Sequence, residues 1–351
     1  MKNLSVTTII QCTVILTRNC NLRCSFCYAK QAGYNKNDSI QYEDLKHIID
    51  FCAEGGVKHL FFLGGEPTLY PELIKALQYV RNKHYNMIPA IATNGIVLDN
   101  FNYCKELVDS GISYIDISLK EQYRSYCDVN SKRNYFARQM NAIKNLSNLP
   151  IEFTCSMVLT KDNVNYFCEL IKTAHDNGAR QFSFTFVIDN EDSPEKELKY
   201  LESNNPFYLI NSFIAQLDQL NSITTNWWVE YSFPLCAYTK EQLLLLKGKL
   251  AAPCQVHTKN GIVFDTDMSV LPCDMCTRDK LGKLGTDFTS YEEFVEWSQN
   301  GAYKDVIDNL NVLPSEDCLS CEHLEACYGG CPVSWKNYSF ESLKNFKFRN
   351  I

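Results

Sequence analysis

Short apolar runs alternate with amphipathic segments through the first half of the chain. Six runs are strand-like, at residues 13–16, 57–63, 88–92, 114–119, 151–159 and 181–187. Between them, apolar residues recur at helical spacing, over residues 42–54, 73–81, 101–110, 135–146 and 163–177. Strands that alternate with helices form a parallel sheet, so the pattern predicts an α/β fold of six strand–helix units, arranged as a closed or a partial barrel.

The pattern changes after the sixth predicted strand. Residues 189–194 form a polar link that contains proline, and one more predicted helix, at about 205–220, ends the first domain. We therefore expect a barrel domain over residues 1–222 and a second domain over residues 223–351. The second domain is loop-rich and cysteine-rich, with one small β-hairpin predicted at residues 261–272.

Reactive and polar residues follow the ends of the predicted strands. Cys20, Gly64, Asn94 and Ser118 lie where four of these strands end. Because chemistry in parallel α/β sheets gathers at the carboxyl ends of the strands, we expect the active site at this edge.

Three cysteines with the spacing CxxxCxxC dominate that edge, namely Cys20, Cys24 and Cys27. Three thiolates suit a [4Fe-4S] cluster, because each of its four irons takes one outer ligand and the fourth iron stays open to a group that is not protein. A zinc loop or buried structural cysteines are the alternatives, although structural zinc usually shows paired CxxC knuckles.

Composition and charge limit the partners. Lys and Arg number 34 against 41 Asp and Glu, a net charge of −7 with no long run of either sign, which argues against nucleic acid. No apolar stretch has the length of a membrane span or of a signal-peptide core, so we expect a soluble, cytoplasmic protein. A reducing compartment would not keep 17 cysteines as disulfides, which favours metal ligation for many of them.

With the cysteine triplet after the first strand and Gly64-Gly65-Glu66-Pro67 after the second, the first domain resembles the radical S-adenosylmethionine (AdoMet) superfamily. The resemblance implies that Cys20, Cys24 and Cys27 hold a [4Fe-4S] cluster, that its open iron binds AdoMet, and that AdoMet is cleaved to a 5′-deoxyadenosyl radical. It also implies that Phe26 packs on the adenine and that Gly64, Gly65, Glu66 and Pro67 receive the methionine amino group.

Four further residues could belong to the AdoMet site. Asn94 and Ser118 match polar positions beside the carboxylate and ribose, although each could instead be a turn former or a cap. Arg133 and Arg138 could reach the carboxylate or could lie on a solvated helix face.

The second domain resembles the SPASM extension of this superfamily, which binds two auxiliary [4Fe-4S] clusters. The likeness rests on the spacing CxxCxxxxxCxxxC of Cys318, Cys321, Cys327 and Cys331. It implies a first auxiliary cluster held by Cys254, Cys273 and Cys331, with Cys236 as the remaining ligand and Cys276 as its competitor. The second cluster would take Cys318, Cys321 and Cys327.

Two positions depart from the SPASM pattern. Met268 stands where the family usually has glycine, so the turn of the hairpin, near residues 265–267, could differ. No seventh motif cysteine follows Cys331. We therefore expect three cysteines at the second auxiliary cluster, with one iron free or bound by another group, while a labile or absent cluster is the alternative.

Asp274 directly follows Cys273, in a segment similar to one in anaerobic sulfatase maturases, where an aspartate takes the proton lost as the substrate is oxidised. A carboxylate beside a cluster and near the barrel mouth is suited to general-base catalysis. A turn-capping aspartate is the alternative.

The resemblance implies an oxidoreductase that takes a hydrogen atom from a peptide or protein, giving an oxidation, a crosslink or a thioether in a ribosomally made peptide (RiPP maturation). Its partners would be that substrate, a separate leader-binding protein and a reductant such as flavodoxin or ferredoxin. One alternative is radical dehydrogenation or rearrangement of a small molecule such as a sugar-like alcohol, which a barrel starting near residue 7 favours. The other is a non-catalytic electron-transfer module, against which the motif at residues 64–67 argues.

Overall fold

A single curved sheet organises the chain. The computed structural model describes residues 8–350 except 25, 84, 120–134, 189–200, 202–204, 231–232 and 252–253. Ten strands follow the order β10-β9-β8-β1-β2-β3-β4-β5-β6-β7. Parallel pairing joins β1 (Gln11–Ile15), β2 (His59–Leu63), β3 (Ile88–Thr93), β4 (Tyr114–Ser118), β5 (Glu152–Leu159), β6 (Phe182–Phe186) and β7 (Trp227–Val229). The predicted α/β fold with a partial barrel is confirmed.

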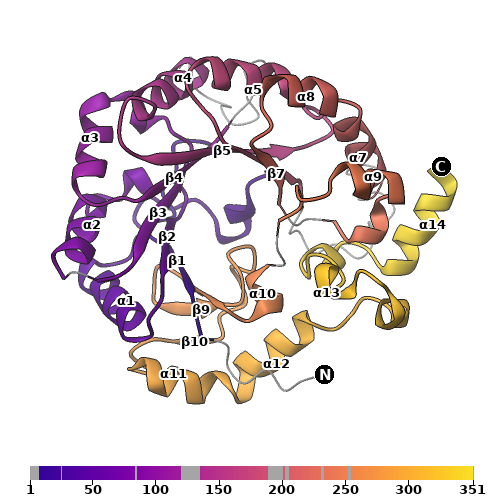
Figure 1. The fold of residues 1–351 in the computed structure, drawn as a ribbon. Coiled ribbons are helices and arrows are strands. Elements are labelled where there is room, and N and C mark those ends of the chain that lie inside the picture. The colour runs from indigo at the N-terminus through magenta and orange to yellow at the C-terminus, as the bar shows by residue number, and fades with distance from the viewer. Residues whose placement is uncertain are drawn as a thin grey trace.

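Helices connect these strands and cover the outer face of the sheet (Figure 1). They are α1 (Tyr42–Glu54), α2 (Leu73–Asn82), α3 (Phe101–Asp109), α4 (Tyr135–Leu146) and α5 (Phe167–Asp176). The helix predicted at 205–220 is instead two helices, α7 (Pro206–Ile214) and α8 (Leu217–Ile223). Aromatic side chains fill the space between the helices and the sheet, as where Phe167 and Phe213 stack with ring centroids 5.4 Å apart.

The predicted hairpin belongs to the barrel sheet. It consists of β8 (Gly261–Phe264) and β9 (Ser269–Leu271), and β10 (Gly282–Lys283) pairs with β9. Strand β8 pairs in parallel with β1, so the first strand of the chain lies between β2 and a strand from the cysteine-rich segment. Met268 adopts φ 67°, a left-handed conformation that glycine takes at no steric cost.

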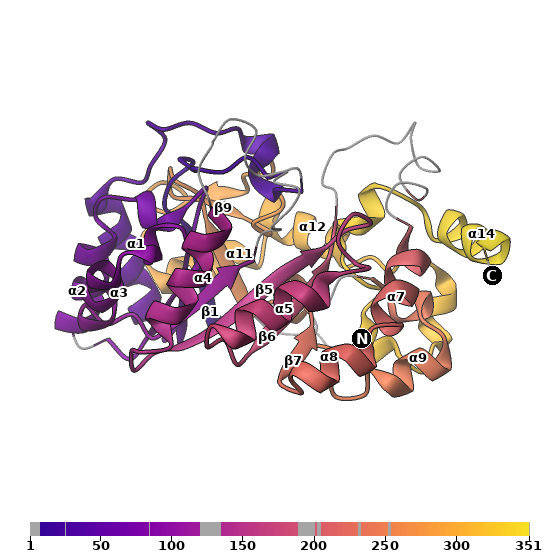
Figure 2. The same ribbon diagram turned by 90° about the horizontal axis from the view of Figure 1, so that it is seen from above.

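The later elements follow the barrel, and those nearest the C-terminus lie on its open side (yellow in Figure 1). The later elements are η5 (Leu235–Ala237), α9 (Lys240–Leu245), α10 (Gln255–Thr258), α11 (Tyr291–Ser298), α12 (Gly301–Leu310), η6 (Glu316–Ser320), α13 (Leu324–Cys327), η7 (Ser334–Lys336) and α14 (Phe340–Asn350). Helix α14 returns to α7, where Phe346 stacks on Phe207 with ring centroids 6.3 Å apart (Figure 2). None of the described helices has the length and apolar character needed to span a membrane.

Candidate active site and cysteine sets

The loop after β1 brings three thiols together. The Leu22 N–H donates to Cys20 Sγ at 3.3 Å, and the Cys27 N–H donates to the Cys24 carbonyl at 3.2 Å, so the loop folds back on itself. Burial raises the pKa of Cys20 to about 12, with smaller contributions from Glu66, Cys24 and Cys27 that oppose the lowering by the Leu22 N–H. All three thiols are half-buried. This donor set suits a [4Fe-4S] cluster, since three thiolates leave one iron open.

No single-ion site accompanies these thiols. Within the described ranges, no three His, Cys, Asp or Glu side chains are arranged to hold one metal ion. Phe26 is half-buried and packs against the main core, and the Tyr28 hydroxyl donates to the Gly64 carbonyl at 3.3 Å. Tyr28 therefore connects the cysteine loop to the loop after β2.

Two glycines let the loop after β2 lie directly on the chain that leads to Cys20. The Gly65 N–H donates to the Thr17 carbonyl at 2.6 Å. A Cβ atom on Gly64 would lie 2.5 Å from Thr17 O, and one on Gly65 would lie 2.4 Å from Asn19 O. Because both obstacles are backbone atoms, only glycine fits, and the two loops keep a fixed relative position.

The Glu66 side chain is buried and forms hydrogen bonds within the protein. Its carboxylate is 1% exposed and accepts hydrogen bonds from Thr68 N at 3.2 Å, Thr68 Oγ1 at 2.6 Å, Thr93 Oγ1 at 2.5 Å and Asn94 N at 2.8 Å. Burial raises the pKa of Glu66 against the lowering effect of these donors. The side chain thus joins η2 (Pro67–Leu69), which begins at the buried Pro67, to the end of β3.

Asn94 and Ser118 both contact Gln139, a residue that the sequence analysis did not identify. The Asn94 amide donates to Asn21 Oδ1 at 2.7 Å, inside the cysteine loop, and accepts from the Ile96 N–H at 3.0 Å. The buried Gln139 donates to the Asn94 carbonyl at 2.6 Å and to the Ser118 carbonyl at 2.9 Å. Gln139 shares the buried face of α4 with Ala142, Ile143 and Leu146, so a polar residue at helical spacing with apolar ones was the available signal.

Of the two arginines named for the AdoMet carboxylate, the structure describes Arg138. Arg138 Nε pairs with Asp99 Oδ2 at 3.1 Å, which agrees with a helix-face role. Arg133 lies outside the described residues.

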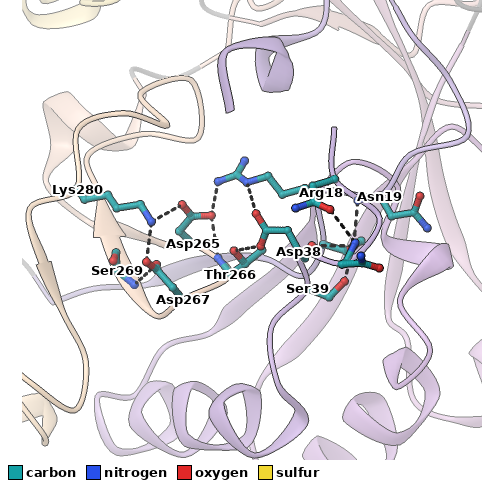
Figure 3. A network of polar contacts seen from close by, with 12 residues as sticks. Arg18, Asn19, Asp38, Ser39, Asp265, Thr266, Asp267, Ser269 and Lys280 are labelled. Carbon is teal, nitrogen blue, oxygen red and sulfur yellow. Dashed lines mark hydrogen bonds and ion pairs between the residues drawn. The ribbon is translucent and has the colours of Figure 1, made fainter. Parts of the chain in front are cut away.

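A buried ion pair joins the cysteine loop to the hairpin (Figure 3). Arg18, 6% exposed, pairs with Asp265, whose side chain is 2% exposed. Arg18 Nε also lies 3.6 Å from Asp38 Oδ2, and the Thr266 hydroxyl donates to Asp38 Oδ1 at 2.6 Å. Lys280 reaches Asp265 at 3.4 Å from the solvent side. The turn of the hairpin is therefore held against the segment that leads into Cys20.

The eight cysteines of the later segment fall into two groups. The first cysteine set is Cys254, Cys273, Cys276 and Cys331, and the second cysteine set is Cys236, Cys318, Cys321 and Cys327. In the first set, burial and then the neighbouring Asp274, Cys276 and Cys331 raise the pKa of Cys273. Burial, and then the nearby Cys254, raises the pKa of Cys331 to about 11.

Cys236 lies with the second set and not, as the sequence suggested, with the first. Burial, then the thiols of Cys327 and Cys318, raise its pKa to about 11. The reason is the path of the chain: η5 packs beside Cys327, and the Leu235 N–H donates to Cys327 Sγ at 3.2 Å. Cys276, three residues after Cys273, lies in the first set, where its N–H donates to the Cys273 carbonyl at 2.9 Å and its thiol is within electrostatic reach of Cys331.

Asp274 lies between the first cysteine set and the cysteine loop. Its Oδ1 accepts a hydrogen bond from the Cys273 thiol at 3.1 Å. Its charge also raises the pKa of Tyr28, beside Cys27, after the larger effect of burial. Although the residue is partly exposed, desolvation of its carboxyl raises the pKa of Asp274.

Comparison with known proteins agrees with this geometry. The model of the Radical SAM superfamily matches residues 14–174. The chain is 30% identical to the Fe-coproporphyrin III synthase of Methanosarcina barkeri over 149 residues, 42% of this chain and 37% of that protein. It is 27% identical to the antilisterial bacteriocin subtilosin biosynthesis protein AlbA of Bacillus subtilis over 185 residues, 51% of this chain and 40% of that protein. It thus spans well under half of either relative.

Two solved structures share the fold over nearly the whole chain. Streptococcus suis SuiB bound to precursor peptide SuiA has a TM-score of 0.68 at 18% identity, covering 96% of this chain and 76% of SuiB. Native anSMEcpe with bound AdoMet and Cp18Cys peptide has a TM-score of 0.66 at 19% identity, covering 97% of this chain and 96% of anSMEcpe. The likeness therefore extends over the cysteine-rich segment as well as the barrel.

Proposed function

We propose that this chain, whose residues 14–174 match the model of the Radical SAM superfamily, is a radical SAM enzyme that oxidises a peptide or protein substrate. The observation that carries the proposal is the position of Asp274. One carboxylate contacts Cys273 of the first cysteine set and is within electrostatic reach of Tyr28 at the radical-generating loop. A substrate carbon between these two regions would have a proton acceptor beside it.

The residues divide the work by position. Cys20, Cys24 and Cys27 would hold the [4Fe-4S] cluster, and the segments at 64–67, Asn94 and Ser118 would border AdoMet. When bound, these cofactors supply a 5′-deoxyadenosyl radical, which removes a hydrogen atom from the substrate. Completing a two-electron oxidation then releases one electron and one proton, and Asp274 accepts the proton at its carboxylate. The two cysteine sets offer sites for the electron acceptor.

Support for a peptide substrate comes from the relatives. SuiB was solved with its precursor peptide and anSMEcpe with the Cp18Cys peptide, and AlbA is a bacteriocin biosynthesis protein. The Fe-coproporphyrin III synthase keeps small-molecule chemistry as the second candidate. A separate leader-binding protein and a reductant such as flavodoxin or ferredoxin belong to the same proposal.

Replacing Asp274 by Asn tests the base. The reduced, anaerobically reconstituted variant should still form 5′-deoxyadenosine from AdoMet but should yield at least ~100-fold less oxidised substrate. Asp279→Asn, which alters a carboxylate paired with Lys336 at 3.4 Å, is the matched control and should behave as wild type. Undiminished product from the Asp274 variant would remove the base assignment.

The substrate class needs its own measurement. Calorimetric titration with short peptides encoded beside this gene should show saturable binding and, with AdoMet and reductant, a mass change in the peptide. A chain that binds none of these peptides, but forms 5′-deoxyadenosine faster when a sugar-like alcohol is added, would favour the small-molecule alternative.

A further inference from the structure

We propose that Cys236 completes a four-cysteine site for a [4Fe-4S] cluster with Cys318, Cys321 and Cys327, and that Cys276 completes the first cysteine set in its place. The inference concerns which irons stay open, so it goes beyond the proposed reaction and does not depend on the substrate. It replaces the three-cysteine site that the sequence led us to expect.

A cavity marks the second site. All four thiols of the second cysteine set line one space of about 120 Å³. Its other walls are mainly apolar, including Pro234, Leu324, Trp335 and Phe340. Cys327 is buried, while Cys236 and Cys321 are exposed, so the space opens to the surface on one side. Thiolate donors within an apolar shell are the environment in which proteins hold iron–sulfur clusters.

Backbone contacts hold η5 at this cavity. The Leu235 N–H donates to Cys327 Sγ at 3.2 Å, and the His323 N–H donates to Cys321 Sγ at 3.4 Å. Such N–H···S bonds are typical of cluster ligands, where they adjust the reduction potential. Cys236 follows Leu235 directly, so the hydrogen bond to Cys327 fixes the position from which the fourth thiol enters.

The turn between Cys327 and Cys331 explains why η5 reaches this place. Tyr328, Gly329 and Gly330 have φ of 48°, 86° and 87°, three successive left-handed residues that redirect the chain. A Cβ atom on Gly330 would lie 2.9 Å from Pro234 N, so the turn and the start of η5 are in direct contact. The same turn therefore sends Cys331 to the first cysteine set and seats Cys236 in the second.

Cys276 fills the first set correspondingly. It is 4% exposed, and its N–H donates to the Cys273 carbonyl at 2.9 Å. Burial raises the pKa of Cys276 to about 12 against the lowering effect of Lys336, with smaller contributions from the nearby Asp279, Asp274 and Cys331. With four thiols in each set, the loop at Cys20 is the one cysteine group among the described residues where a cluster would leave an iron open. The two auxiliary clusters would then carry electrons and would not bind substrate.

Two other donors line the same cavity and define the competing outcome. His323 and Asp317 both border it, so either could serve as the fourth ligand in place of Cys236. Their side chains also have other contacts: His323 Nε2 lies 3.8 Å from Glu322, and Lys344 lies 3.5 Å from Asp317.

The experiment isolates the auxiliary clusters by replacing Cys20, Cys24 and Cys27 with Ala in the full chain. After anaerobic reconstitution this background should hold about eight irons, against about twelve in wild type. Adding Cys236→Ala or Cys236→Ser should remove about four irons, or leave a cluster whose electron paramagnetic resonance spectrum changes on addition of cyanide. Without that substitution, cyanide should leave the spectrum unchanged, because no iron is open. Cys276→Ala should have the same two effects on the other cluster.

His323→Ala and Asp317→Ala are the matched controls and should keep about eight irons. The proposal is overturned if a Cys236 variant keeps its iron and its cyanide-insensitive spectrum, or if the His323 or Asp317 variant shows the loss instead. Circular dichroism separates ligand loss from unfolding, and because Cys236 is exposed, its replacement by Ser should leave the spectrum of the folded chain intact.

Discussion

Replacing Arg18 by Met should destabilise the protein much more than replacing Lys280 by Met, although both residues pair with Asp265. Arg18 is 6% exposed and its partner Asp265 is 2% exposed, so the Met variant leaves a carboxylate buried with only an outer partner. Lys280, 45% exposed and 3.4 Å from Asp265, supplies that outer partner. The two cations share the acceptor Asp265 and differ in burial, and each has one further partner, Asp38 for Arg18 and Asp267 for Lys280.

The magnitudes follow from burial. Removing one member of a buried pair costs about 3–5 kcal/mol of unfolding free energy, because the remaining charge is left without compensation. An exposed pair contributes about 0–1 kcal/mol. The double variant Arg18→Met/Asp265→Asn removes both charges. In the wild type the Thr266 N–H donates to Asp265 Oδ1 at 2.8 Å, and the amide oxygen of the new Asn side chain can still accept this hydrogen bond. We therefore expect it to recover at least about 2 kcal/mol relative to Arg18→Met.

Urea unfolding at constant ionic strength, with all variants reconstituted anaerobically in parallel, gives the comparison from the midpoints and slopes. Arg18 is also two residues from Cys20, so the Arg18 variant should lose iron from the cysteine loop at lower urea than wild type. Equal destabilisation by the Arg18 and Lys280 variants, or a double variant no better than Arg18→Met, would refute the argument from burial.

Three further substitutions test the loops around the cysteine triplet. Gly65→Ala should cost about 3 kcal/mol of unfolding free energy and lower iron binding, because its Cβ would lie 2.4 Å from Asn19 O. The control Gly56→Ala, where φ is 69° and the space is open, should cost about 1 kcal/mol and keep all iron. Iron analysis and urea unfolding check both variants. Glu66→Gln should cost about 2 kcal/mol, since an amide presents a donor where the carboxylate only accepts, and wild-type stability would contradict its positioning role. Gln139→Met, which removes two hydrogen bonds at similar volume, should cost about 1–3 kcal/mol and weaken AdoMet binding measured by calorimetry, and unchanged affinity would separate Gln139 from the site.

Much of the fold could be predicted because its determinants are local. The helices over 42–54 and 135–146 occur where the apolar spacing predicted them, the first of them ending at the predicted glycine stop, and all six predicted strands occur. The helix predicted at 205–220 is two helices, because the backbone leaves the helical conformation at residues 215 and 216. The division was not predicted, because the apolar pattern is continuous across these residues. Periodicity records which face is buried and does not record such a break.

The candidate site divides in the same way. The motif at residues 64–67 could be found from the sequence. The reason for its glycines could not, because they are required by the close backbone of Thr17 and Asn19, and that proximity depends on strands β1 and β2 lying side by side. Gln139 could be noticed as a polar residue on an apolar helix face, but its role could not be predicted, because the atoms it contacts are backbone carbonyls at the ends of two other strands.

The sequence by itself determined which residues can do chemistry: the CxxxCxxC loop, the spacing of the later cysteines and Asp274 are all evident without a fold. Only the tertiary structure decided how the thiols are grouped. Cys236 and Cys327 are far apart along the chain. They meet because the turn at residues 328–330, three left-handed residues of which two are glycines, lets η5 pack against it. A cluster site requires thiols that are close in space, and the turn at residues 328–330 separates Cys327 from Cys331, so spacing in the sequence could name candidate ligands but could not group them.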